Sequence, residues 1–301
     1  MNSVRFITLI ILISITSVAS AAKFKAIEHA EGYEHDKYVT KVLGEAGQSN
    51  IKREFRAYIT EFDGDDDDNG DHINDFLGVP HYVAYQMKKY KGKLETGPKR
   101  PSSWITDNDL YKAGIAPKDG SYRHSRAFLK ANPNWYVRGH LCMKMHAWRL
   151  GANADWNTHT VLNAVPQRQQ FNAGIWLDLE YKTAEWADKF GDVWIIAGPI
   201  FKPKKNEPSK WLGEIEKGEK LIAIPDYLFK IIIREGTSEN NPEVLAFVYP
   251  QDSVQGGPYD HSPYLTSVSD IEEMTGIDFM TALPDDIERN IESVVATTIW
   301  E

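Results

Sequence analysis

Three short stretches decide how this sequence is interpreted: residues 137–140 are VRGH, residues 163–167 are NAVPQ, and residues 171–180 are FNAGIWLDLE. Hydrolysis of a phosphodiester needs a base that deprotonates water, a cation that offsets charge on the phosphate oxygens, and donors that hold the phosphate. His140 suits the base because imidazole titrates near neutral pH. Arg138 can donate to a phosphate in a fixed fork. The three stretches therefore predict a site that cleaves phosphodiesters.

Asn172 and Glu180 supply the oxygen atoms that such a site needs for a metal ion. Asn172 offers one neutral oxygen, which suits Mg²⁺ held mostly by water. Glu180, two helical turns further on, can reach the waters of that ion and orient them. A single ion could then act as Lewis acid and stabilise the leaving group. Taken alone, Asn172 would also fit a helix cap, and His140 a structural histidine.

The spacing of these residues resembles the motif of the DNA/RNA non-specific endonuclease family, the ββα-metal (His-Me finger) nucleases. That motif is Asp-Arg-Gly-His followed by N-x-x-P-Q-x-x-x-x-N-x-G-x-W-x-x-x-E. The positions that match its second part are Asn163, Pro166, Gln167, Asn172, Gly174, Trp176 and Glu180. Flanking similarity extends the resemblance over about residues 78–295.

The resemblance implies an α+β fold of the ββα-metal type, with a central, mainly antiparallel sheet flanked by helices. It makes His140 the general base that activates water. It makes Asn172 the direct ligand of Mg²⁺, with Mn²⁺ as a substitute, and Glu180 the residue that holds the hydrated ion.

The resemblance also assigns residues around the metal. Arg138 and Arg100 would contact or stabilise the phosphate, and Asn163 and Gln167 would support the site. DNA and RNA would be the substrates, cut with little sequence preference, because the motif addresses phosphate and metal rather than bases. A homodimer is left open.

Two positions depart from the family pattern. Val137 stands where the motif has its aspartate, so other groups must orient Arg138 or His140. Ala184 stands where the family has a further arginine, one helical turn after Glu180. These departures leave open a catalytically degenerate extracellular nucleic-acid-binding module. A nuclease restricted to DNA is a second alternative, because the motif addresses phosphate and metal rather than bases.

The N-terminus predicts an export signal. Arg5 precedes an apolar run at residues 6–15, and residues 19–21 form the small-x-small pattern of a cleavage site. The alternative, a membrane anchor, needs about 20 apolar residues, and the run is shorter. We therefore expect residues 1–21 to be removed and the mature protein to be secreted or periplasmic, without stable membrane association. Cys142 is the single cysteine, so no intramolecular disulfide can form.

The charge of the chain is unevenly distributed. The formal net charge is −9, but residues 61–75 contain eight acids and no Lys or Arg. Basic residues cluster at 88–93, 99–100 and 123–149. Phosphates at contact distance respond to this local positive field rather than to the net charge of the chain.

The acidic stretch has the composition of a calcium loop. Asp67, Asn69, Asp71 and Asp75 resemble positions 1, 3, 5 and 9 of Asp-rich Ca²⁺ loops, whose oxygen ligands wrap the ion. No Glu closes the loop in this register. A structural Ca²⁺ site and a solvated acidic linker both remain open.

We expect three segments: a signal peptide at 1–21, an N-terminal extension with the acidic loop at 22–77, and the nuclease domain at 78–301. Residues 23–60 have some helical character. Apolar and β-branched runs predict strands at 79–87, 193–197, 221–224, 228–233 and 244–248. Periodicity and composition predict helices at 126–131, 171–190 and 284–295. Strands in series, with helices between and after them, indicate an α+β fold.

Overall fold

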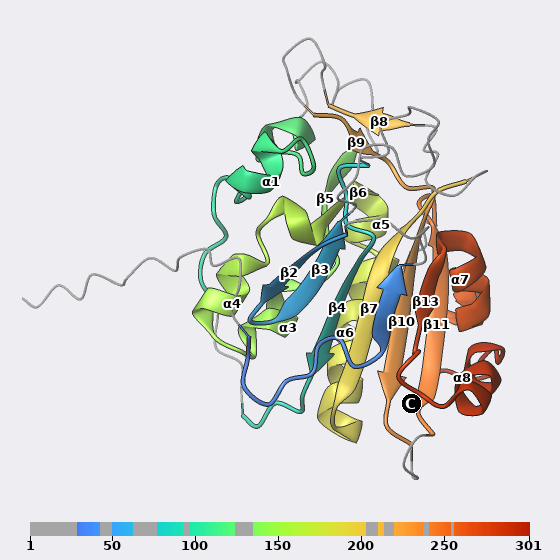
Figure 1. Cartoon of the computed structure of the whole chain (residues 1–301). Helices are drawn as coiled ribbons and strands as arrows, with labels where there is room; N and C mark the ends of the chain where they lie inside the picture. The colour runs from blue at the N-terminus through green and yellow to red at the C-terminus, as the bar shows by residue number, and fades with distance from the viewer. Residues whose placement is uncertain are drawn as a thin grey trace, which may run out of the picture.

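A seven-stranded antiparallel sheet forms the centre of the structure (Figure 1). The structure is a computed structural model that describes residues 29–42, 50–62, 77–92, 97–123, 135–202, 210–213, 220–236, 241–253 and 256–301. The strand order is β12-β11-β10-β7-β4-β3-β2, and all neighbouring pairs are antiparallel. The strands are β2 (Ile51–Phe55), β3 (Tyr58–Phe62), β4 (Tyr82–Met87), β7 (Val193–Ile200), β10 (Tyr227–Arg234), β11 (Glu243–Pro250) and β12 (Leu265–Thr266).

Shorter elements surround this sheet. Two-stranded pairs are formed by β1 (Val39–Val42) with β13 (Ile277–Phe279), β5 (Tyr136–His140) with β6 (Ala164–Arg168), and β8 (Trp211–Leu212) with β9 (Ile222–Ala223). The helices are α1 (Asn108–Lys112), α3 (Lys144–Trp148), α4 (Ala152–Asn157), α5 (Gln169–Asn172), α6 (Ile175–Phe190), α7 (Val268–Thr275) and α8 (Asp285–Glu292). Single 3₁₀ turns lie at Asp119–Tyr122, Val161–Asn163 and Ser262–Tyr264.

Both faces of the sheet are buried, because side chains alternate between two hydrophobic clusters. On β4, Val83 and Tyr85 join the larger cluster with α6, whereas Tyr82 and Ala84 join the cluster that contains residues of α7 and β13. Figure 1 shows the corresponding layers, with α3 to α6 on one side of the sheet and α7 and α8 on the other. This arrangement confirms the expected α+β architecture with a mainly antiparallel sheet.

The predicted helix at 171–190 is two helices in the structure. α5 ends at Asn172, and α6 begins at Ile175. Gly174 separates them: a Cβ there would lie only 2.6 Å from the carbonyl oxygen of Gln170. Asn172 therefore lies outside α6 and does not continue the helix face that carries Glu180.

The helical character expected at residues 23–60 is wrong for the described part of that segment, which contains β1, β2 and β3. The hairpin of β2 and β3 extends the central sheet through β4. Its charged residues, typical of a sheet edge, obscure the strand pattern, although Phe55, Tyr58 and Phe62 are buried. The described part of the expected N-terminal extension is thus continuous with the sheet.

Several predictions fall on other parts of the chain. The signal peptide at 1–21, the acidic stretch at 63–75 and the helix at 126–131 lie outside the described residues. Strands β7, β10 and β11 confirm three predicted strands, and α8 confirms a shorter form of the predicted C-terminal helix. In the described ranges, no helix is both long enough and apolar enough to cross a membrane.

Candidate active site

The hairpin of β5 and β6 carries the VRGH stretch. The strands pair so that His140 lies opposite Ala164 and Arg138 lies opposite Pro166. Because side chains alternate along a strand, Arg138 and His140 share one face. Gly139 lies on the other face, where a Cβ would be 2.1 Å from Cδ of the buried Gln167. The glycine and the glutamine of the motif are therefore required together, since Gln167 occupies the space that a side chain at 139 would need.

Asn163 fixes the backbone just after His140. Its Oδ1 accepts a hydrogen bond from the Cys142 amide at 2.8 Å, and its Nδ2 donates to the Cys142 carbonyl at 2.9 Å and the Thr158 carbonyl at 3.0 Å. The side chain is fully buried. Every polar atom of this amide is thus used within the fold, which makes Asn163 a residue that shapes the turn.

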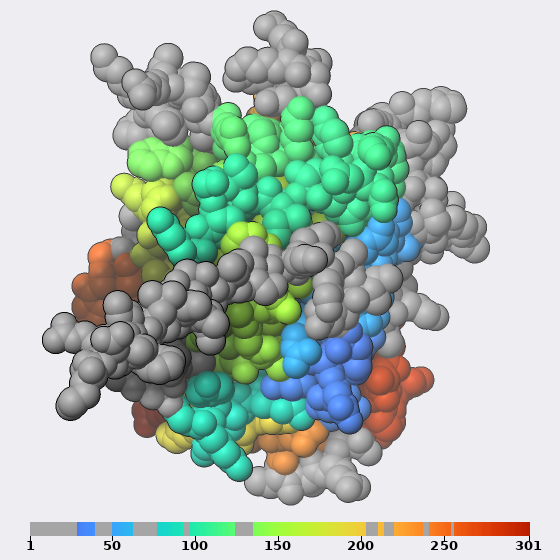
Figure 2. All heavy atoms as spheres, turned by 90° about the vertical axis from the view of Figure 1, so that its left-hand side faces the viewer, coloured from blue at the N-terminus to red at the C-terminus, as the bar shows by residue number. Residues whose placement is uncertain are grey.

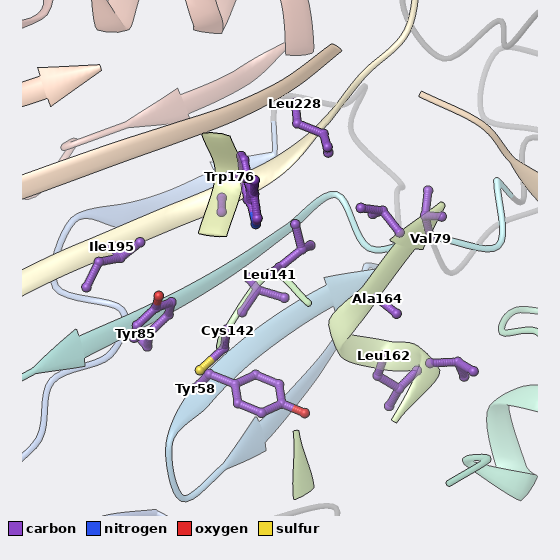
Figure 3. Packing of buried hydrophobic residues seen from close by; sticks show 14 of the residues in the cluster. Tyr58, Val79, Tyr85, Leu141, Cys142, Leu162, Ala164, Trp176, Ile195 and Leu228 are labelled. Atoms are coloured by element: carbon purple, nitrogen blue, oxygen red, sulfur yellow. The ribbon is translucent and has the colours of Figure 1, made fainter. Parts of the chain in front are cut away.

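Trp176 ties α6 to the same strand. Its indole Nε1 donates to the carbonyl oxygen of His140 at 3.3 Å. Leu141 and Cys142, which follow His140, point into the hydrophobic core, where Cys142 lies beside Tyr58 (Figure 3). His140 therefore projects from a backbone that is held on both sides.

His140 lies among aromatic rings and positive charges. Its ring centroid is 4.6 Å from that of Trp104 and 5.4 Å from that of His159. Burial lowers the pKa of His140 well below its ordinary value, and the charges of His159, Arg100, Lys144 and Arg138 lower it further. The Nε2 atom is buried and has no hydrogen-bond partner among the described residues. Burial and the neighbouring positive charges thus favour the neutral form of the imidazole.

Arg138 is oriented by a buried carboxylate. Its Nη2 lies 2.9 Å from Oδ1 of Asp119, which also accepts a hydrogen bond from the Trp104 amide at 3.1 Å. The guanidinium carbon lies 5.5 Å from the centroid of the Trp104 ring. Asp119 and Trp104 together hold the guanidinium on the face of β5 that carries His140.

Glu180 lies on α6, one turn after Trp176, and is buried. Burial raises the pKa of Glu180 to about 7, whereas Lys230, a hydrogen bond from Trp176, and Arg100 act to lower it. Its Oε1 atom has no hydrogen-bond partner among the described residues. A buried carboxylate oxygen without a donor is costly unless something binds it.

Lys230 contributes a fully buried amine whose charge acts on the Glu180 carboxylate. It interrupts the apolar sequence of β10, and its Nζ lies 4.0 Å from the centroid of the Trp176 ring. Burial lowers the pKa of Lys230 to about 8, whereas the negative charges of Glu180 and Cys142 act to raise it. Lys230 is thus an internal cation that favours the ionised form of Glu180.

The segment before α1 brings a further positive charge to the site. Arg100 is exposed, and its charge lowers the pKa values of both His140 and His159. On α3, the Nζ atom of Lys144 lies 2.8 Å from Oδ2 of Asp155, which is buried on α4. Figure 2 shows residues 97–123 lying next to the α3–α4 region on this face of the molecule.

Asn172 is the last residue of α5, between the strand that carries Gln167 and the helix that carries Glu180. Its side chain is half-buried. The start of α5 is tied to the hairpin, because the Gln169 amide donates to the Trp135 carbonyl at 2.8 Å. The structure thus places the Asn172 segment against the strands that present His140 and Arg138.

These residues fit a hydrated divalent cation. Asn172 offers a neutral oxygen, and Glu180 offers a buried carboxylate oxygen that lacks a donor. Few direct protein ligands and several bound waters are what Mg²⁺ prefers.

Comparison with known families identifies the fold. The model of the DNA/RNA non-specific endonuclease family matches residues 71–286. The chain belongs to this family. Its members are nucleases.

Over the aligned residues, individual relatives are about a quarter to a third identical to the chain. A mitochondrial nuclease EXOG of Danio rerio is 31% identical over 162 residues, which are 53% of this chain and 46% of that protein. A nuclease of Serratia marcescens is 28% identical over 71% of this chain and 73% of its own length. The bovine (Bos taurus) mitochondrial endonuclease G is 27% identical over 60% of each chain. The match thus spans about half the length of the EXOG relative.

A solved structure supports the family fold independently. The crystal structure of the EndoG/EndoGI complex contains a chain with a TM-score of 0.60, covering 77% of this chain and 86% of the other at 19% identity. At this identity the likeness concerns the fold alone.

The structure shows how this family member accommodates Val137. Val137 and Arg138 are successive residues of β5 and face opposite sides, and Arg138 pairs with the carboxylate of Asp119. Ala184 is buried on α6, and the cations that act on Glu180 are Lys230 and Arg100.

Sequence reasoning missed four residues of this site: Trp104, Asp119, His159 and Lys230. The first three come from loops or helix ends without fixed spacing to the motif, so no pattern marks them. Lys230 did leave a signal, because a lysine within an apolar strand must face either solvent or a buried partner.

Proposed function

We propose that this chain is an exported endonuclease that uses Mg²⁺, or Mn²⁺ in its place, to hydrolyse DNA and RNA with little sequence preference. The observation that carries the proposal is the neutral, half-buried His140, whose unpartnered Nε2 lies among the charges of Arg138, Arg100 and Lys144. An imidazole in its neutral form can act as a base toward water. The surrounding cations can stabilise the charge of a phosphate.

The imidazole of His140 accepts the proton of a water molecule. The water oxygen forms a bond to phosphorus, one P–O ester bond breaks, and the leaving oxygen takes a proton from solvent. Arg138, held by Asp119, donates to the non-bridging phosphate oxygens, and the exposed Arg100 adds a second positive charge. No contact in this set addresses a base, which favours low sequence preference.

Asn172 would bind Mg²⁺ directly, and Glu180 would hold its waters through a carboxylate whose ionised form Lys230 favours. The bound ion supplies Lewis-acid stabilisation of the phosphate and of the leaving oxygen. Asn163 and Gln167 support the site by fixing the turn and the hairpin.

The central experiment incubates the purified mature protein with plasmid DNA and with a long RNA, in Mg²⁺ and in EDTA. We expect both substrates to be cut only with Mg²⁺. We expect His140→Ala to lose about 10²–10⁴-fold in rate while its circular dichroism spectrum is retained. Intact nucleic acid in every lane, with retention on a gel shift, would instead identify a binding module, and cleavage of DNA alone would identify a DNA-restricted nuclease.

The two metal roles are separated by initial rates measured against Mg²⁺ concentration. Asn172→Ala should need much more Mg²⁺ and stay slow at saturation, because it removes the direct ligand. Glu180→Gln should lose about 10–100-fold but remain measurable, because it acts through water. A wild-type Mg²⁺ midpoint and rate for Asn172→Ala would place the metal elsewhere, with Asp155 and Asp178 the next ligands to test.

Export rests on the pattern of Arg5, the apolar run at 6–15 and the small residues at 19–21. Two of the relatives above carry the word mitochondrial in their names, so organelle import is the competing route. The test is intact-mass measurement of protein recovered from cells and from the medium. A mature chain beginning at residue 22 outside the cytoplasm supports export, and retention in mitochondria refutes it.

A further inference from the structure

A group of three carboxylates lies on the side of the sheet opposite α6. Glu272 comes from α7, Asp278 from β13, and Glu292 from the last position of α8. One oxygen atom of each lies within 4.8 Å of the others. Three separate elements thus bring negative charges to one point.

Glu292 is the buried member of this group. The residue is only 6% exposed, and its Oε1 is buried without a hydrogen-bond partner among the described residues. Glu272 is fixed from the other side, because its Oε1 accepts a hydrogen bond from the Phe279 amide at 2.8 Å. Among the described residues, the fold therefore buries a Glu292 oxygen without a partner in a carboxylate that lies beside two others, an arrangement that is costly unless a cation or proton lies between them.

The surrounding charges do not offset this repulsion. Burial, the charges of Glu272, Glu288 and Asp278, and a hydrogen bond with the Glu272 side chain together raise the pKa of Glu292 to about 8. The nearby Arg289 is exposed and donates its Nε to the carbonyl of Asp285 at 2.9 Å. Each charged group found to act on Glu292 is thus an acid.

The spacing suits a calcium ion. Two oxygens bound to one ion can be separated by at most twice the metal–oxygen distance, which is about 4.6–5.2 Å for Ca²⁺ and about 4.2 Å for Mg²⁺. The oxygens lie within 4.8 Å of one another, an upper bound that the longer Ca²⁺–oxygen distances satisfy and that does not by itself exclude Mg²⁺. Water can complete its coordination on the exposed side.

We propose that Glu272, Asp278 and Glu292 form a structural Ca²⁺ site that joins α7, β13 and α8. β13 also pairs with β1, so the ion would fix the layer that covers this face of the sheet. The site is separated by the sheet from α6 and its Glu180, and it does not depend on the proposed catalysis.

The test is the melting temperature of the full mature chain, stripped of metal and titrated with Ca²⁺ in constant millimolar Mg²⁺. The wild type should gain on the order of 5 °C at a hundredfold excess over the dissociation constant. Glu292→Gln should lose this gain. Without Ca²⁺ it should melt at the wild-type temperature or above, because one repelling charge is gone. Glu272→Gln should behave alike and serves as the second variant.

Two controls locate the effect. Glu273→Gln removes an exposed charge from the same helix and should keep the full Ca²⁺ response. The double variant Asp67→Ala/Asp71→Ala removes the rival acidic loop and should also keep it. The proposal is overturned if the wild type shows no Ca²⁺ response, if both glutamine variants retain it, or if only the loop variant loses it. A wild type that ignores Ca²⁺ but melts higher as pH falls would indicate a proton shared between Glu272 and Glu292.

Discussion

Lys230 and Glu180 show how single residues couple the core of this molecule to its chemistry. Burial alone would leave Glu180 largely protonated near pH 7, and the amine of Lys230 opposes that effect from the adjacent strand. Trp176 lies against Lys230 and bonds to the backbone of His140. A substitution of Lys230 in the middle of β10 can therefore change the protonation of Glu180 although Lys230 does not contact substrate.

We predict that Lys230→Met lowers activity by about tenfold at pH 7, in the range of other changes behind a metal site. Without the amine, the pKa of Glu180 rises further, so the acidic limb of the rate profile should move to higher pH and part of the activity should return there. The control Lys182→Met removes a half-exposed lysine that lies 3.9 Å from Asp178 and should have little effect.

The double variant Lys230→Met/Glu180→Gln tests the route of this effect. If Lys230 acts through Glu180, the double variant should be no slower than Glu180→Gln alone. Rates are compared at saturating Mg²⁺, with near-ultraviolet circular dichroism to confirm folding. Additive losses would assign Lys230 a different role.

At this scale, the motif residues could be proposed from the sequence because of their spacing, although the structure distributes them over one hairpin, a 3₁₀ turn and two helices. It did not reveal the partners of those residues. Asp119 reaches Arg138 from a different loop, and Trp104 reaches His140 from the segment before α1. Such contacts depend on the packing of segments far apart in the chain, which produces no periodic pattern in the sequence.

At the scale of elements, the β5–β6 hairpin depends on one missing side chain. Gln167 fills the space beside Gly139. We predict that Gly139→Ala destabilises the protein by about 1–3 kcal/mol, the usual cost of overpacking, and that adding Gln167→Ala restores part of the loss. Urea denaturation measures both. Gly256→Ala is the matched control, since its Cβ would meet nothing within 4 Å. Equal stability of Gly139→Ala and the wild type would contradict this account.

The contact of α7, β13 and α8 predicts a pH dependence of stability. The folded pKa of Glu292 is about 8, above its ordinary 4.5. Its contribution to stability is therefore present below the unfolded pKa and lost as pH rises through the folded pKa. In excess EDTA, the melting temperature of Glu292→Gln should increase relative to the wild type between pH 5 and pH 9. A difference that stays constant across this range would refute the assignment.

Elements with long apolar runs were the most predictable. β7 and β10 are buried over almost their full length and β11 through its centre, so their sequences show apolar runs. The edge strand β2 and its hairpin partner β3 carry charges that resemble a loop. α7 did leave a readable signal, the capping box of Ser267 and Asp270 and the left-handed Gly276, which periodicity alone does not detect.

At the scale of the whole molecule, the sheet separates two tasks. One face carries the hairpin, α5 and α6 with the residues around His140. The other carries the layer of β1, β13, α7 and α8 with its carboxylate group. The charges are also unevenly distributed. Several cations of the nuclease face are paired with carboxylates inside the protein: Arg138 with Asp119, Lys144 with Asp155, and Arg149 with Asp188. The net charge of −9 therefore says little about the field that a nucleic acid meets.

This division predicts which positive charges control the salt dependence of cleavage. Removing one cation that binds a phosphate reduces the slope of log kcat/KM against log salt by about one. Arg100 is exposed and acts on His140, so Arg100→Ala should lower kcat/KM and reduce the slope by about one. Arg289→Gln removes an equally exposed charge from α8, on the opposite face, and should leave the slope unchanged. Initial rates on a long duplex over a range of NaCl concentrations measure both. If the two variants changed the slope equally, the substrate would sense the charge of the whole protein rather than that of one face.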